Sequence, residues 1–296
     1  MKTILFLFIA IFFISSNTSH IIAQNISSFE IKWQKSQQKA DSIAAVFSKN
    51  NPEITHHKVA FKTFYDSIAK KETVLDMFIE VPKGKGPFPV MIFIHGGGFV
   101  GGNKSYLTPQ SFAVAQKGIV AVSIEYRLQG HGGSYTDFIQ DTMDAIDFIR
   151  KHAKQYQIDF SRLALSGGSA GGYLSSYAAM KTPECICYVG YNGLYDLESR
   201  EKDRSRFSIN TKNIDELSPI RMIKTPPPAT LLLHGKEDTT IDPRQSVEFA
   251  EAIRTKGGKA EVILYDGQKH GFFNREPYLT RTTQAMVAHV ISVLKP

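Results

Sequence analysis

The feature that most constrains the fold is a series of short apolar runs that alternate with helical segments from residue 90 onwards. The runs lie at residues 90–94, 118–124, 162–165, 186–189, 230–233 and 260–264. Apolar runs without polar alternation are typical of parallel strands covered on both faces. The segments with helical character between them lie at residues 111–116, 135–156, 170–180, 243–255 and 279–294. This alternation predicts an α/β domain with a mostly parallel central sheet and helices on both of its faces.

The N-terminus carries the one long apolar run, at residues 4–14, behind a single positive residue, Lys2. These eleven residues are too few to cross a bilayer as a helix, which needs about 20. Small and polar residues follow, which is typical of a secretory signal with cleavage near Ala23 or Gln24. We therefore expect a signal peptide at 1–23 and a secreted or periplasmic protein with no membrane span after cleavage. An uncleaved anchor or a buried first helix is the alternative.

The rest of the sequence predicts an N-terminal helical segment followed by one large domain. Residues 24–57 carry apolar side chains at helical spacing, and residues 58–296 contain the sheet pattern, beginning with an expected antiparallel pair at 58–65 and 73–81. Residues 191–217 show neither helical nor strand periodicity, and 8 of the 11 residues from 196 to 206 are charged. They predict a short cap-like insertion or, alternatively, a solvated surface excursion.

Charge and cysteine content exclude several classes of protein. Lys and Arg number 35 against 28 Asp and Glu, a net charge of +7, but the basic residues are scattered. A basic stripe interleaved with aromatic residues is missing from the sequence, so nucleic acid is not an expected partner. The two cysteines, Cys185 and Cys187, are too few for a disulfide framework or a zinc site. We expect both to be small core residues, and we expect no metal and no organic cofactor.

The strongest chemical signal is the sequence GGSAGG at residues 167–172, between a predicted strand and a predicted helix. A nucleophilic serine needs a sharp strand-to-helix turn, and very small neighbours let the two elements pack around it. Glycine stands two residues before and two residues after Ser169. A phosphate-binding turn is the alternative, but no Walker lysine follows and the Rossmann spacing does not fit. The pattern therefore predicts Ser169 as a nucleophile.

A second glycine-rich segment, HGGGF at residues 95–99, ends the predicted strand 90–94. Acyl transfer places negative charge on the former carbonyl oxygen, and backbone N–H groups of such a loop can approach it closely. The expected donors of this oxyanion hole are Gly97 and Gly98, together with Ala170 at the start of the helix after the serine. We expect His95 to be structural.

With these two motifs the chain resembles the α/β-hydrolase superfamily, and more closely the hormone-sensitive-lipase-like esterases and the small bacterial feruloyl and acetylxylan esterases. The resemblance extends from about residue 60 to the C-terminus. The segments that carry it are HGGGF at 95–99, EYR at 125–127, GGSAGG at 167–172, HGKED at 234–238 and KHGF at 269–272. It implies the α/β-hydrolase fold, with a sheet covered on both faces and a short polar insertion.

The resemblance also implies a catalytic triad in the chain order Ser, Asp, His. Asp238 follows the predicted strand 230–233 where the family has its acid, and His270 matches the family's general base. Asp242 is an alternative acid and Glu237 a weaker one, because the loop after Asp238 carries one residue more than the family pattern. His131 precedes the serine and breaks this order, although its loop could reach the substrate.

Substrate class is a further expectation. Many lipase-like members carry aspartate where this chain has Gly168, whereas the glycan-directed relatives more often have a small residue. Tyr191, Asn192 and Tyr195 follow a predicted strand at the edge that lines the ligand crevice of open α/β sheets, so substrate contacts are plausible there. We treat the EYR segment as structural.

Together these features predict a serine esterase that acts on short-acyl or aromatic-acid esters, either small molecules or polysaccharides. One alternative is a serine peptidase of the prolyl-oligopeptidase type, although such enzymes carry a large propeller for which this chain has no room. The other is a non-catalytic binding protein on the same fold. The oligomeric state does not follow from the sequence.

Overall fold

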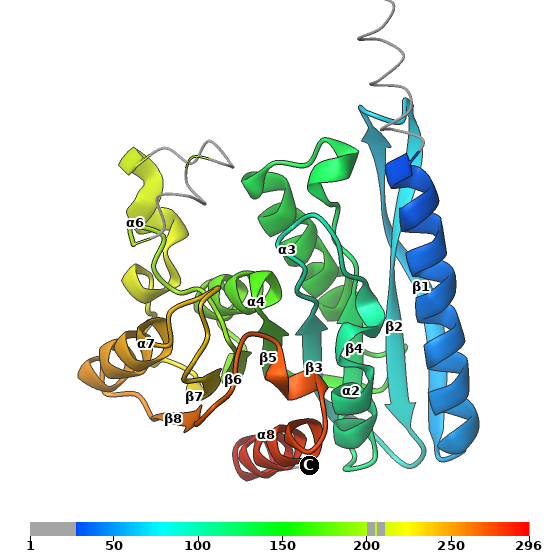
Figure 1. Ribbon diagram of the computed structural model, residues 1–296. Coiled ribbons are helices and arrows are strands. Elements are labelled where there is room, and N and C mark those ends of the chain that lie inside the picture. Colours follow the sequence, from blue (N-terminus) through cyan, green and yellow to red (C-terminus); the bar gives the residue numbers. More distant parts are fainter. Residues whose placement is uncertain (1–27, 200–204, 206–210, 296) are drawn as a thin grey trace, which may run out of the picture.

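A computed structural model describes residues 28–199, 205 and 211–295. The predicted signal peptide, 1–23, lies outside the described residues, as does part of the predicted insertion at 191–217. The sheet has eight strands in the order β1-β2-β4-β3-β5-β6-β7-β8 (Figure 1). Their bounds are β1 Ile54–Asp66, β2 Lys71–Pro82, β3 Phe88–Ile94, β4 Val120–Ile124, β5 Ile158–Gly168, β6 Cys185–Tyr191, β7 Ala229–Gly235 and β8 Ala260–Tyr265.

The sheet is parallel from β4 to β8, and β1 and β2 are antiparallel additions at one edge. The mostly parallel sheet and the antiparallel first pair were both predicted, and both are confirmed. β1 also contains a bulge, where its register with β2 shifts between Ala60 and Lys62.

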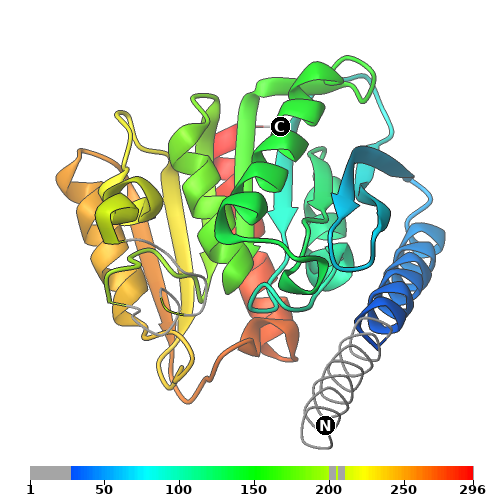
Figure 2. The same ribbon diagram turned by 90° about the horizontal axis from the view of Figure 1, so that it is seen from above.

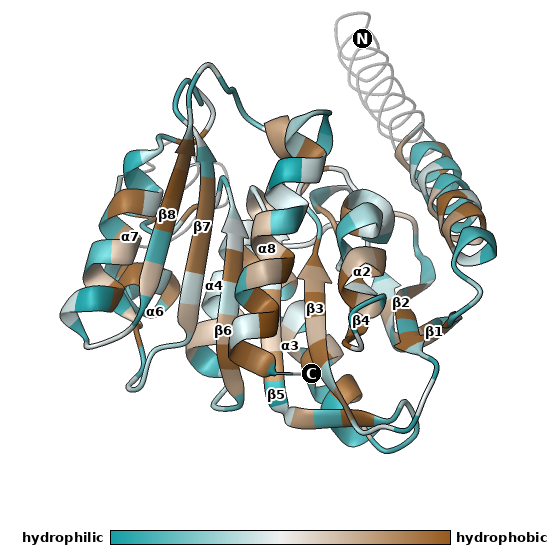
Figure 3. Ribbon diagram, turned by 90° about the horizontal axis from the view of Figure 1, so that it is seen from below, coloured by the Kyte–Doolittle hydropathy of each residue, from teal (hydrophilic) through white to brown (hydrophobic). Residues whose placement is uncertain are grey.

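Helices cover both faces of the sheet. On one face lie α3 (Tyr135–Lys151), α4 (Ala170–Lys181) and α7 (Arg244–Thr255). On the other lie α2 (Thr108–Ala115) and α8 (Tyr278–Leu294), which Figure 3 shows in front of the strands. The strand β3 shows why its sequence is apolar throughout: Ile92 and Ile94 face the first layer, whereas Met91 and Phe93 face the second. Each residue of such a strand is buried on one side or the other.

A helix over residues 28–50 lies beside the antiparallel edge of the sheet, as Figures 1 and 2 both show. Small side chains on its inner face, Ala40 and Ala44, pack on Phe78 of β2. Among the described residues, no helix is long and apolar enough to cross a membrane.

The boundary between α3 and β5 differs from the prediction. Helix α3 ends at Lys151 instead of Tyr156, and β5 begins at Ile158, four residues before the predicted strand. Between them Gln157 adopts a left-handed conformation (φ +55°), which turns the chain from the helix into the strand. The start of β5 contains polar residues, and Asp159 there accepts hydrogen bonds from the N–H and hydroxyl groups of Ser161. This polar pattern hides the start of the strand in the sequence.

Candidate active site

Ser169 occupies the turn between β5 and α4 in a strained conformation with a positive φ angle (φ +57°, ψ −121°). Its N–H donates to the carbonyl of Tyr191 (2.9 Å), which fixes the turn to β6. Glycine is required around it: a Cβ on Gly171 would lie 2.1 Å from the carbonyl oxygen of Ile94, and one on Gly167 would lie 2.2 Å from that of Gly171. The close approach of strand, turn and helix therefore depends on the absence of these side chains.

The structure brings the three predicted triad residues together. The His270 Nε2 atom lies 2.9 Å from Ser169 Oγ, and its Nδ1 atom lies 2.7 Å from Asp238 Oδ2. The three residues follow β5, β7 and β8, whose carboxyl ends meet at one edge of the sheet. The order of the strands thus brings Asp238 and Ser169, which are 32 and 101 residues from His270 in the sequence, into contact with it.

Asp238 is buried and held by several donors. Its Oδ1 atom accepts from the backbone N–H groups of Thr240 (2.8 Å) and Ile241 (3.0 Å). Burial raises its pKa, but hydrogen bonds from His234, His270 and Ile241 outweigh that effect and hold the pKa well below its usual range. Asp238 is therefore an anion at neutral pH.

This carboxylate selects the tautomer of the histidine. Because Nδ1 of His270 faces an acceptor-only group, it carries the ring proton, and Nε2 presents a lone pair to the Ser169 hydroxyl. The arrangement can remove a proton from the serine and stabilise the imidazolium that results.

The alternative acids lie elsewhere. Asp242 accepts from Nε and Nη2 of Arg244 at the surface (2.9 and 2.7 Å), and the Glu237 side chain is exposed. Of the three acids, Asp238 is the one in contact with His270.

The glycine-rich loop after β3 passes directly beside the serine. A Cβ on Gly96 would stand 3.3 Å from Ser169 Cβ. Gly97 and Gly98 have positive φ angles of 122° and 60°, and both are at least partly accessible. The N–H groups of these two glycines have no hydrogen-bond acceptor in the part of the chain that the structure describes. Ala170 opens α4, where N–H groups are free to bind an anion.

A buried network of polar side chains supports this loop. The Nδ1 atom of His95 lies 2.8 Å from the Gly96 carbonyl, and its Nε2 atom lies 3.3 Å from Glu125. Glu125 accepts from the Lys104 N–H (2.8 Å), and the Lys104 ammonium lies 2.7 Å from Asp76 of β2. Although burial raises the pKa of Glu125, its contacts with His95 and Lys104 leave that pKa below the usual range. His95 is thus structural, as predicted.

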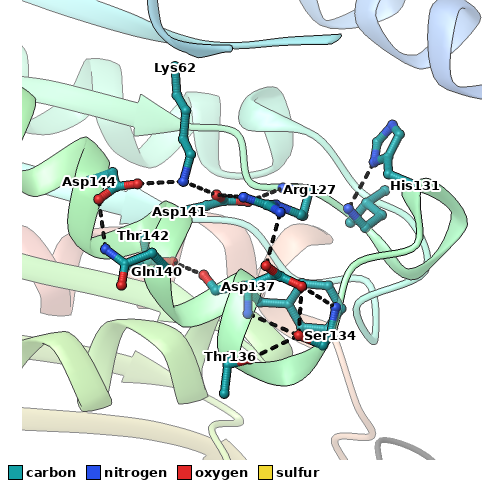
Figure 4. A network of polar contacts seen from close by, with 12 residues as sticks. Lys62, Arg127, His131, Ser134, Thr136, Asp137, Gln140, Asp141, Thr142 and Asp144 are labelled. Carbon is teal, nitrogen blue, oxygen red and sulfur yellow. Dashed lines mark hydrogen bonds and ion pairs between the residues drawn. The ribbon is translucent and has the colours of Figure 1, made fainter. Parts of the chain in front are cut away.

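The EYR segment is structural too. Arg127 donates from Nε and Nη2 to both oxygens of the fully buried Asp141 (2.7 and 2.8 Å), and Lys62 of β1 reaches Asp141 as well (2.7 Å) (Figure 4). The loop after Arg127 hydrogen-bonds the glycine-rich segment, because Gln129 N–H donates to the Phe99 carbonyl (2.8 Å).

The side chains considered for substrate contact, His131 and the three at and beyond the end of β6, are buried. His131 is buried; its Nδ1 atom accepts from the Leu128 N–H, and its ring packs edge-on against Trp33. Tyr191, Asn192 and Tyr195 are fully buried. Their side chains do not reach the surface, so they are not positioned to contact a substrate in this structure.

His234 is a residue whose role the sequence did not reveal. It is fully buried; its Nδ1 atom lies 2.7 Å from Ser246 Oγ, and its Nε2 atom lies 3.0 Å from the Ile241 carbonyl and 3.3 Å from Asp238 Oδ2. The histidine therefore holds the loop that carries Asp238. A histidine at the end of a buried strand, four positions before an acid, was the available signal.

The two cysteines are free and buried, in keeping with their prediction as core residues. No group of three or more His, Cys, Asp or Glu side chains suited to a metal ion occurs among the described residues.

Comparisons with known proteins agree with this fold. The BD-FAE family model matches residues 75–202, which include the glycine-rich loop and Ser169. The chain is 29% identical over 230 residues to the Arabidopsis thaliana protein named probable isoprenylcysteine alpha-carbonyl methylesterase ICMEL1, covering 66% of this chain and 48% of that protein. It is 29% identical over 232 residues to esterase LipC of Mycobacterium tuberculosis, covering 67% and 57%. The chain thus spans about half the length of these curated relatives.

Solved structures give the same result. The apo form of Thermogutta terrifontis esterase 2 superposes with a TM-score of 0.71 at 24% identity, covering 81% of this chain and 95% of that one. The chain therefore has the α/β-hydrolase fold, the fold of this solved structure. The proteins that it matches in these comparisons are named as esterases.

Proposed function

We propose that this protein is a serine esterase in which Ser169 is the nucleophile, His270 the general base and Asp238 the acid of the triad. The observation that carries the proposal is the continuous hydrogen-bonded relay from Asp238 through His270 to Ser169, with distances of 2.7 and 2.9 Å. The names of the matched relatives support the same reaction class.

The first half of the proposed reaction forms an acyl-enzyme. Ser169 Oγ attacks the ester carbonyl carbon while its proton passes to Nε2 of His270. The carbonyl oxygen becomes an oxyanion that accepts from the N–H groups of Gly97, Gly98 and Ala170. When the tetrahedral intermediate collapses, the bond to the alcohol oxygen breaks, and His270 returns its proton to that oxygen.

The second half releases the acid by the same steps, with water in place of serine. His270 takes a proton from the water, the hydroxide oxygen bonds to the acyl carbon, and Ser169 leaves with the proton. The Asp238 carboxylate stabilises the imidazolium in both halves. Neither half requires a metal or an organic cofactor.

We further propose short-acyl or aromatic-acid esters carried on small molecules or glycans as substrates, met outside the cytoplasm after removal of residues 1–23. Enzymes that act on lipid surfaces need a broad apolar face on which to settle. Residues 196–206 are rich in charge instead. This favours water-soluble or polymer-borne esters.

The test is a panel of esters on the purified protein without residues 1–23, with matched alcohols and acyl chains from acetyl to dodecanoyl, together with feruloyl esters. We expect the highest kcat/KM on acetyl, butyryl or feruloyl esters. A preference for chains of ten carbons or more, or activation at an oil–water interface, would indicate a lipase. A serine-directed phosphonate should label the parent at Ser169 and leave Ser169→Ala unlabelled.

A further inference from the structure

The residue before the candidate nucleophile, Gly168, packs against an aromatic ring from a distant part of the chain. A Cβ on Gly168 would stand 2.7 Å from Cζ of Phe273 and 3.3 Å from Cε1 of Tyr106. The shorter distance is too small for two carbon atoms, so the Phe273 ring occupies the space that a side chain at 168 would need. The φ angle of Gly168 does not lie in the left-handed region, so space and not backbone conformation requires glycine here.

The Phe273 ring also packs on the strand that holds the nucleophile turn. Its partner there is Tyr191 of β6, with ring centroids 4.7 Å apart and an interplanar angle of 34°. The carbonyl of Tyr191 accepts from the Ser169 N–H (2.9 Å). Both rings are fully buried, so neither can move aside into solvent. The position of Phe273 is therefore fixed relative to Ser169.

Phe273 lies three residues after His270, and the backbone between them is compact. Gly271 turns the chain with a φ angle of +75° into the short helix Phe272–Asn274. The Asn274 N–H then donates to the Gly271 carbonyl (3.3 Å). A displacement of the Phe273 ring therefore also displaces the backbone next to His270.

On the other side of His270, the chain is joined to the loop of the acid. The Glu237 N–H donates to the Gln268 carbonyl (3.0 Å). This bond connects the residues before His270 to the loop that carries Asp238. His270 thus has a backbone anchor toward Asp238 before it and an aromatic anchor toward Ser169 after it. The 2.7 and 2.9 Å contacts of its ring depend on both anchors.

We propose that Phe273 is the positioning residue that sets the distance between His270 and Ser169. Glycine at position 168 is its necessary complement in size. The inference rests on the proposed esterase function, because this distance matters only where His270 takes the serine proton. A side chain at 168 displaces the ring, and the packed segment carries His270 with it. Phe273 is fully buried, so it acts through His270 and not by contact with substrate.

The experiment measures kcat and KM on 4-nitrophenyl acetate, with active sites counted by phosphonate titration. Gly168→Ala should lower kcat about 100-fold, because a misplacement of about 1 Å costs that much. KM should stay within about threefold, since the displaced group is the base and not a substrate contact. Phe273→Leu removes the far end of the ring and makes space for the new methyl group. Adding it to Gly168→Ala should therefore raise kcat by at least about tenfold.

Two controls separate positioning from stability. Phe272→Leu changes the neighbouring ring, which packs on Tyr265 with centroids 4.9 Å apart, and it should not restore the activity of Gly168→Ala. Gly258→Ala brings a Cβ to 2.5 Å from a proline carbon near the amino end of β8, the edge of the sheet opposite Ser169. It should lower the urea midpoint as Gly168→Ala does, but leave kcat within about twofold of the parent.

The outcomes are distinct. A kcat of Gly168→Ala within about threefold of the parent, or equal rescue by the two Phe-to-Leu changes, overturns the positioning role and leaves the esterase intact. If Gly168→Ala does not fold, Phe273→Leu alone decides. It should lower kcat about tenfold at unchanged KM, and a kcat within about twofold of the parent overturns the assignment. A parent that hydrolyses no ester and is not labelled by the phosphonate overturns the proposed function itself, and the positioning role falls with it.

Discussion

Replacing Asp238 by asparagine tests the acid of the proposed triad most directly. The carboxylate accepts on both oxygens: Oδ1 takes the Thr240 and Ile241 N–H groups, and Oδ2 takes Nδ1 of His270. An asparagine has one acceptor oxygen. If it faces the backbone donors, the NH₂ group faces Nδ1, which can then no longer carry a proton. His270 adopts the other tautomer and directs an N–H at Ser169.

The magnitude follows from this change. A histidine with its proton on Nε2 cannot accept the serine proton, and the same substitution in serine proteases lowers kcat by about 10⁴. That factor corresponds to about 5 kcal/mol of transition-state stabilisation. We expect a similar fall for Asp238→Asn, with KM changed little because the carboxylate does not contact substrate.

The assay is kcat on 4-nitrophenyl acetate, with the concentration of active sites measured by phosphonate titration. Asp242→Asn is the matched control, because Asp242 pairs with Arg244 at the surface and should tolerate the change within twofold. Activity of Asp238→Asn within tenfold of the parent would refute the tautomer argument. A larger loss in Asp242→Asn would show that the acid has been misassigned.

Three further predictions concern the same site. Ser169→Ala should lower kcat by about 10⁶ and leave the circular dichroism spectrum unchanged; activity within tenfold of the parent would exclude Ser169 as nucleophile. Gly171→Ala should cost 3 kcal/mol or more in unfolding free energy, roughly the upper end for overpacking, because its Cβ would meet backbone oxygen at 2.1 Å. Gly257→Ala, with a φ of +78° but open space, should cost only about 1 to 2 kcal/mol in urea titrations, and equal losses would contradict this reading. The Asp238 pKa is depressed on folding, so its stabilising contribution is fully present above the unfolded value of about 3.9 and is lost progressively as the pH falls from that value toward the folded one. The difference in unfolding free energy between the parent and Asp238→Asn should therefore shrink between pH 5 and pH 3, and a constant difference would contradict it.

The sequence was most informative where one residue type has a single physical use. Apolar runs without alternation predicted the parallel strands, and glycines flanking Ser169 predicted a tight turn, since a side chain at Gly171 has no space. The spacing of Asp238 and His270 from Ser169 fitted loops at one edge of such a sheet, and their side chains do meet there.

Other features depend on packing that no local pattern records. Tyr191 and Tyr195 follow a strand at the expected edge, yet both are buried, against Phe273 and Phe249, because the chain folds back over the strand end. Lys104 is buried, and its burial depends on counter-charges from residues distant in the sequence, Asp76 and Glu125. The contact of His234 with Asp238 depends on the path of the intervening loop.

The two ends of the sheet affect how the protein behaves in a crowded solution. An open strand edge is a template for pairing with another chain, and so for aggregation. At one end, the bulge in β1 breaks the regular register, and the half-exposed Lys58 places a charged side chain along the strand. At the other end, β8 has only six residues, and the Arg254 guanidinium already bonds the Ala260 carbonyl (2.8 and 3.0 Å). Both edges are therefore poor templates for pairing with another chain.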